Sequence, residues 1–88
     1  MKRIWLLEPI DPNCRKPGSS SYRFSYDAYH GFVVCAETEG EAREIASGNP
    51  GDEGADSWTD IAITSCEDIG IANDSTSTGI VLADMRAG

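Results

Sequence analysis

Basic residues are few in this sequence, and most of them lie near its beginning. The 88 residues hold 15 Asp and Glu against 7 Lys and Arg, a formal net charge of −8. From Phe24 to Met85 the only base is Arg43, set against 13 acids, so this stretch carries 1 − 13 = −12. Direct binding to nucleic-acid phosphates needs clustered Lys and Arg. We therefore expect no direct nucleic-acid binding and a basic partner instead; the alternative is that the acids serve solubility alone.

Long apolar segments and paired cysteines are also missing. No run approaches the ~20 apolar residues that a membrane span needs. The first eight residues are basic and then apolar, as in a signal peptide, but the apolar part is too short, and we expect a first strand instead. Cys14, Cys35 and Cys66 are an odd set, which predicts free thiols in the cytoplasm. A Cys35–Cys66 bridge is the alternative.

Residues that carry catalysis or hold metals are scarce. His30 is the single histidine, and no nucleophile or orienting carboxylate is fixed beside it, so we expect a surface or packing role. The cysteines lack the C-x2-C spacing of zinc sites. Counted from Asp52, the acids do not match a calcium loop, because its sixth position is Ser57 instead of glycine. Phosphate loops and nucleophile elbows are absent. We expect no cofactor, no metal and no enzymatic activity.

Strand and helix patterns follow one another along a single expected domain, residues 1–88. Alternating or apolar runs predict strands over 3–8, 32–36, 60–67 and 80–85, and a strand-like stretch over 22–26 precedes the second. One helix is expected between the second and third strands. The predicted fold class is α+β, a small antiparallel β-sheet of about four strands in the order β-β-α-β-β, with one α-helix packed on one face.

The helix has the clearest local signals in the sequence. Thr38 can cap it, and Glu41 completes a capping box. Glu39 and Arg43 can pair at i, i+4 on its outer side. The run 48–50, Gly-Asn-Pro, ends it. The helix face and the strands together predict a core of Ile4, Leu6, Phe32, Val34, Ala42, Ile45, Ala46, Ile61, Ile63, Ile80 and Leu82.

An acidic, glycine-rich loop follows the helix, with the sequence GNPGDEGADSW over 48–58. We expect it to bring carboxylates to a basic surface, with glycine letting the backbone adapt. Trp58 is either an aromatic anchor beside these charges or a cover for the core edge. The predicted partner-binding ridge comprises Glu41, Glu44, Asp52, Glu53, Asp56, Trp58, Glu67 and Asp68.

Residues 31–67 carry a pattern that resembles a loose set of small phage and prophage proteins. The pattern is a GFVV strand, an EAR-x-x-A helix, a GDEG loop, a tryptophan and TSCE. These motifs are structural and transfer no catalytic role. The resemblance implies the class of anti-CRISPR and other anti-defence inhibitors. It implies a DNA mimic in the host bacterial cytoplasm that binds a basic surface of a defence protein, the DNA-recognition subunit of a CRISPR effector.

Two other functions fit the sequence. One is a generic phage accessory or interaction protein. The other is a binding sponge for a signalling nucleotide, with Tyr22, Arg23, Tyr26 and Tyr29 as the only cationic or aromatic groups that could converge on a pocket. The sequence is compatible with a monomer or a dimer.

Overall fold

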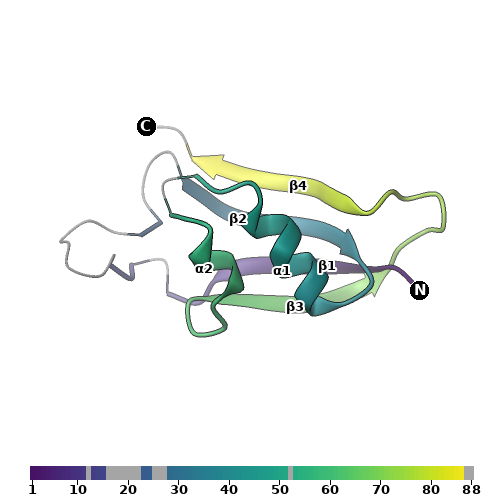
Figure 1. The fold of residues 1–88 in the computed structure, drawn as a ribbon, viewed down its shortest axis with the longest axis horizontal. Helices are drawn as coiled ribbons and strands as arrows, with labels where there is room; N and C mark the ends of the chain where they lie inside the picture. The colour runs from purple at the N-terminus through teal and green to yellow at the C-terminus, as the bar shows by residue number, and fades with distance from the viewer. Residues whose placement is uncertain (12, 16–22, 25–27, 52, 87–88) are drawn as a thin grey trace.

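A four-stranded antiparallel sheet carries two helices on one face (Figure 1). A computed structural model describes residues 1–11, 13–15, 23–24, 28–51 and 53–86. The elements are β1 (Arg3–Pro9), β2 (Ala28–Ala36), α1 (Glu39–Ser47), α2 (Asp56–Thr59), β3 (Thr64–Ile71) and β4 (Gly79–Arg86). The strand order is β3-β1-β2-β4. The predicted α+β class is confirmed, and α2 is a one-turn addition to the predicted order.

Two strands differ from the predicted ones by more than one residue: β2 begins earlier, and β3 both begins later and ends later, at Ile71 instead of residue 67. β2 begins at Ala28 and includes Gly31. His30 is an extra residue in β2 that forms a bulge against β4, and the strand continues through it. The predicted stretch 22–26 lies mostly outside the described residues. β3 begins at Thr64 because Asp60 starts a turn: the Ala62 backbone N–H donates to Asp60 Oδ1 at 2.8 Å.

Helix α1 begins and ends where its sequence predicts. The Glu41 backbone N–H donates to the Thr38 side-chain oxygen at 3.2 Å, so Thr38 is the N-cap. The Glu41 carboxylate accepts from the backbone N–H of Glu37, one residue before the cap, at 3.0 Å. The helix ends at Ser47, and Gly48 follows as its C-cap. The Thr38 contact satisfies one donor that the helix start leaves without a partner, whereas the Glu41 carboxylate bonds to the Glu37 N–H instead of the Thr38 N–H of the predicted capping box.

The core lies between the helices and one face of the sheet. Its buried residues are Leu7, Phe24, Phe32, Val34, Ala36, Ala42, Ala46 and Trp58. Paired residues of antiparallel strands point to the same face. Leu7, opposite Phe32, therefore belongs to the covered face, and Leu6, opposite Val33, belongs to the uncovered one. We call this second face the open face.

Several predicted core residues are wrong because they lie on the open face, in a turn or on an edge strand. Phe32, Val34, Ala42 and Ala46 are buried, and Ile45 and Ile63 pack against the cluster as predicted. Ile61 is 74% exposed because it lies in the turn before β3, and Ile80 and Leu82 are exposed on edge strand β4. Ile4 and Leu6 are only partly buried. In β1 only Leu7 is buried, and Trp5 is partly buried against the core cluster, so this strand is not covered on both faces.

The three cysteines are free, as predicted. Cys35 is buried, whereas Cys14 and Cys66 are partly buried. Burial raises the pKa of the Cys66 thiol to about 11, which makes it a poor nucleophile near neutral pH. Among the described residues, no helix is long and apolar enough to cross a membrane.

Candidate partner-binding site

The central carboxylate of the acidic loop points into the protein. Glu53 is 1% exposed. Its Oε1 accepts from the backbone N–H groups of Tyr29 at 3.0 Å and Gly51 at 2.9 Å. Its Oε2 accepts from the indole Nε1–H of Trp58 at 2.6 Å. Three donors therefore satisfy this buried carboxylate, and the prediction that Glu53 contacts a partner is wrong.

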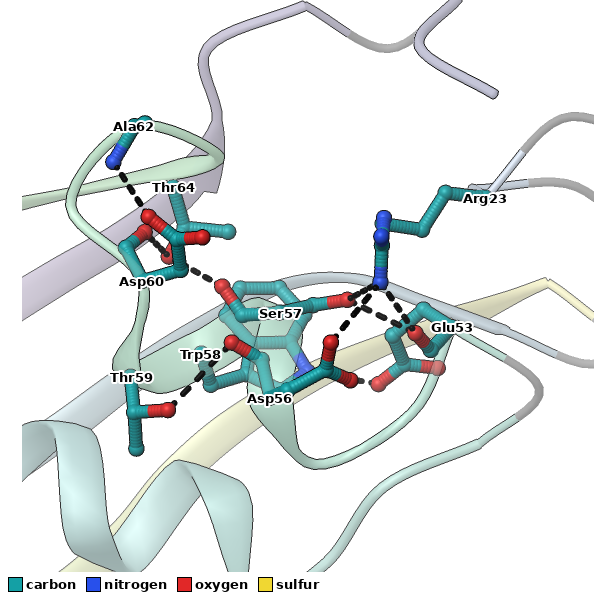
Figure 2. A network of polar contacts seen from close by, with 9 residues as sticks. All are labelled: Arg23, Glu53, Asp56, Ser57, Trp58, Thr59, Asp60, Ala62 and Thr64. Atoms are coloured by element: carbon teal, nitrogen blue, oxygen red, sulfur yellow. Dashed lines mark hydrogen bonds and ion pairs between the residues drawn. The ribbon is translucent and has the colours of Figure 1, made fainter. Parts of the chain in front are cut away.

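Arg23 fixes the same loop from its other side. It is 6% exposed, and its Nη1 donates to Ser57 Oγ at 3.0 Å and to the Glu53 carbonyl at 3.4 Å (Figure 2). The same nitrogen lies 3.4 Å from Asp56 Oδ2, whose side chain remains largely exposed. Ser57 Oγ in turn donates to the Glu53 carbonyl at 2.7 Å. These bonds stabilise the single turn of α2, which is too short to be stable alone.

Arg43 joins α1 to the loop and to β3. Its Nε donates to Glu39 Oε2 at 2.9 Å, which confirms the predicted i, i+4 pair. Its Nη1 donates to the Trp58 carbonyl and to Thr64 Oγ1, both at 3.1 Å, and its Nη2 donates to the Thr64 carbonyl at 3.0 Å. Arg43 is 7% exposed. The expectation that the pair lies on the outer side of the helix is wrong for Arg43. Its guanidinium group is buried and donates to oxygens of Trp58 and Thr64 below the helix.

Trp58 belongs to the core and not to an exposed interface. Its ring is fully buried and packs edge-on against Phe32, with ring centroids 4.8 Å apart, and against Phe24 at 5.7 Å. Its indole N–H is bonded to Glu53, as a buried tryptophan requires. The prediction of a partner contact by Trp58 is therefore wrong, and its alternative role in covering the core is confirmed.

These burials leave an acidic surface over the two helices. Residues 37–60 hold eight acids and one base, 1 − 8 = −7. That base, Arg43, is buried and pairs with Glu39, so it compensates one exposed acid of this segment directly. The acids that reach solvent from this segment in the described structure are Glu37, Glu39, Glu44, Asp56 and Asp60, with Glu41 partly exposed. We call these six residues the acidic helical layer; α1 and α2 carry four of them on the same face of the sheet (Figure 1).

The predicted ridge is thus divided by the fold. Glu41, Glu44 and Asp56 lie in the acidic helical layer. Glu67 is exposed on the open face, because it lies opposite Leu6 in the register. Asp68 forms an ion pair with Arg3, and the hydrogen bond from Arg3 lowers the pKa of Asp68. Asp52 lies outside the described residues.

The tyrosine-rich stretch does not form a described ligand pocket. Tyr29 is partly buried against Phe32, with ring centroids 4.8 Å apart, and Arg23 bonds to the acidic loop. Tyr22 and Tyr26 lie outside the described residues. His30 packs edge-on against Phe24 at 6.1 Å. In the described ranges, no group of three or more His, Cys, Asp or Glu side chains is placed to hold a metal ion.

Comparison with known proteins gives no relative for this chain: no family model, curated protein or solved structure matches it. The functional argument therefore depends on the residues themselves. Sequence reasoning missed the buried roles of Arg23 and Glu53. One local signal for the burial of Glu53 was present. Gly51 and Trp58, which donate to its carboxylate, lie close to it in the sequence.

Proposed function

We propose that this protein is a non-catalytic inhibitor that binds a basic, nucleic-acid-binding surface of another protein through its acidic helical layer. It occupies the place of the nucleic acid and acts as a charge mimic. The observation that carries the proposal is the burial of Arg43, the only base among residues 37–60, beneath a layer of exposed carboxylates.

The form of the layer supports this function. Arg43 of α1 donates to Trp58 of α2 and to Thr64 of β3, so these bonds connect the elements that carry the exposed acids. A preordered acidic surface loses little conformational entropy on binding. Opposite charges on two proteins steer their encounter and raise the association rate.

For the partner class we rely on the sequence pattern of residues 31–67, which we expect to be that of small phage and prophage proteins. We propose a bacterial defence complex as the target, with the DNA-recognition subunit of a CRISPR effector as its specific form, and the host cytoplasm as the site of action. Such complexes hold DNA through Lys and Arg grooves, which offer the charge that this layer complements.

The test is a competition assay on a panel of purified DNA-binding defence effectors, CRISPR effectors included. Fluorescence anisotropy of labelled target DNA is measured with increasing amounts of this protein, at low and at moderate salt. We expect displacement of DNA from at least one effector, and weaker displacement at the higher salt because exposed charges are screened.

Charge-reversed variants locate the contact. Glu37→Lys with Glu44→Lys changes the acidic helical layer, and Asp11→Lys with Asp74→Lys is the matched control outside it, since all four side chains are exposed. The first pair should weaken inhibition by about 1–2 kcal/mol, roughly 5- to 30-fold, and the control pair by far less. Equal losses from both pairs, or full DNA binding by every effector in excess inhibitor, contradict the proposal. The second outcome favours an accessory protein whose acids serve solubility.

A further inference from the structure

The open face of the sheet has a groove of about 170 Å³. Leu6, Val33 and Leu82 line it together with Glu8 and Asp84, and His30 also borders it. Gly31 lies opposite Asp84 in the register and adds no side chain between the strands, which leaves room there. The groove is remote from the acidic helical layer, because the helices cover the other face of the sheet.

The apolar part of the groove is a continuous strip across three strands. Leu6 on β1 lies opposite Val33 on β2, and Val33 lies opposite Leu82 on β4. Leu82 is 64% exposed. Side chains directly opposite one another in an antiparallel pair are close enough to form one surface. An exposed apolar strip bordered by polar groups is typical of an interaction site.

The charged part of the groove is acidic. Glu8 and Asp84 are both exposed and belong to its lining, and Glu67 lies opposite Leu6 on the same face. Within the described structure, the Glu8 carboxylate makes no hydrogen bond or ion pair. No lysine or arginine occurs at 4–8, 31–35, 65–70 or 79–84. A second copy placed face to face would therefore set carboxylates against carboxylates, which disfavours self-association here.

Strand addition at the sheet edges is disfavoured as well. The edge strands are β3 and β4. The register of β3 shifts at Ile69, and that of β4 shifts at Val81, so each edge contains an extra residue. Bulges twist an edge away from regular pairing and protect it from other strands. The face itself, and not its edges, is the remaining surface for a partner.

We propose that this groove receives an arginine or lysine side chain of a partner protein. The methylene stem lies on Leu6, Val33 and Leu82, and the cationic head reaches Glu8 and Asp84. Long basic side chains combine an apolar stem with a charged end, and carboxylates are their strongest hydrogen-bond acceptors in proteins. The volume fits one side chain and is below the range of small-molecule pockets. This second contact surface does not depend on the proposed function.

The test is an NMR titration of the isotope-labelled protein with acetyl-arginine-amide. Acetyl-citrulline-amide is the matched probe, since it has nearly the same shape without the charge. We expect saturable shifts at the amides of Leu6, Val33 and Leu82 with the arginine probe, and clearly weaker binding of citrulline. The double variant Glu8→Gln with Asp84→Asn should bind arginine about tenfold more weakly. Asp74→Asn, a charge loss in the loop between β3 and β4 and outside the groove, should leave the affinity unchanged.

Three results would overturn the inference. The first is equal binding of the two probes, the second is a set of shifts confined to α1 and α2, and the third is no saturation with arginine. A concentration-dependent dimer in light scattering that Leu82→Asp abolishes would assign the face to a second copy instead. Neither the probes nor the readout involves a nucleic-acid-binding protein, so failure here and failure of the proposed function are separate outcomes.

Discussion

The buried carboxylate of Glu53 gives the strongest stability prediction in this protein. Glu53→Ala removes the acceptor for three donors: the indole N–H of Trp58 and the backbone N–H groups of Tyr29 and Gly51. A buried donor left without a partner costs about 1–3 kcal/mol. Some of the three will find water once the loop relaxes, so we expect a total loss of about 3–5 kcal/mol.

That loss is large for a chain of this size. A domain of 88 residues has a free energy of unfolding of roughly 5–10 kcal/mol. Glu53→Gln should cost less, about 1–3 kcal/mol. Its oxygen can still accept from the two backbone N–H groups, whereas its amide N–H₂ faces the Trp58 donor.

Urea unfolding followed by tryptophan fluorescence measures both effects, because Trp58 bonds directly to the altered group. Glu44→Ala is the control, as an exposed glutamate on α1, and should change the free energy of unfolding by less than about 0.5 kcal/mol. If Glu53→Ala unfolds at the same urea concentration as Glu44→Ala, the buried network contributes nothing and the reasoning is refuted.

Four smaller effects can be measured in the same background. Thr38→Ala should lower the free energy of unfolding by about 1 kcal/mol through loss of the N-cap, and an unchanged urea midpoint would contradict it. Gly54→Ala should cost about 1–2 kcal/mol, because φ is +85° and its Cβ would lie 2.9 Å from a carboxylate oxygen; equal stability would show that the loop relaxes freely. With a pKa of about 11, Cys66 should react with iodoacetamide at pH 8 far more slowly in the folded than in the unfolded protein, and equal rates would refute its protection. Arg3 lowers the pKa of Asp68, so this ion pair stabilises the fold above pH ~4, the range of an unperturbed Asp. Its contribution is lost as the pH falls through the folded pKa. In an NMR titration Arg3→Gln should raise the Asp68 pKa, and no change would exclude the pair.

Local signals predicted the parts of the fold that depend on neighbours in the chain. The cap at Thr38, the end of α1 at Ser47 and the Glu39–Arg43 pair involve residues within four positions of each other. The strand patterns also predicted the class of the fold. Which face of each strand is covered depends on the position of the helices, and this is a long-range property. Leu82 therefore could not be distinguished from a core residue by hydropathy.

The candidate site was harder to predict, because partners far away in the sequence bury charged residues that would otherwise be expected at the surface. Glu53 looked like one more surface acid, yet its partners include the Tyr29 amide, 24 positions away. Arg23 looked like a cation available to a ligand, and it bonds to Ser57, 34 positions away. Charge composition predicts the sign of the surface, whereas the inward or outward orientation of a group also depends on long-range contacts that a local pattern does not contain.

The internal network and the acidic surface are two results of the same burial. Arg23, Arg43 and Glu53 are removed from the surface and carry +2 − 1 = +1 in the interior. The formal charge of −8 then leaves −8 − 1 = −9 on the other residues. The buried arginines stabilise the acidic loop by donating to carbonyl and hydroxyl oxygens of buried residues. In these buried positions each arginine pairs with one exposed acid, Arg43 with Glu39 on α1 and Arg23 with Asp56 on α2, and the other acids of the layer keep their charge. A sequence that kept both arginines exposed would have a less ordered loop and a less acidic helical layer, so stability and the charge available for binding increase together here.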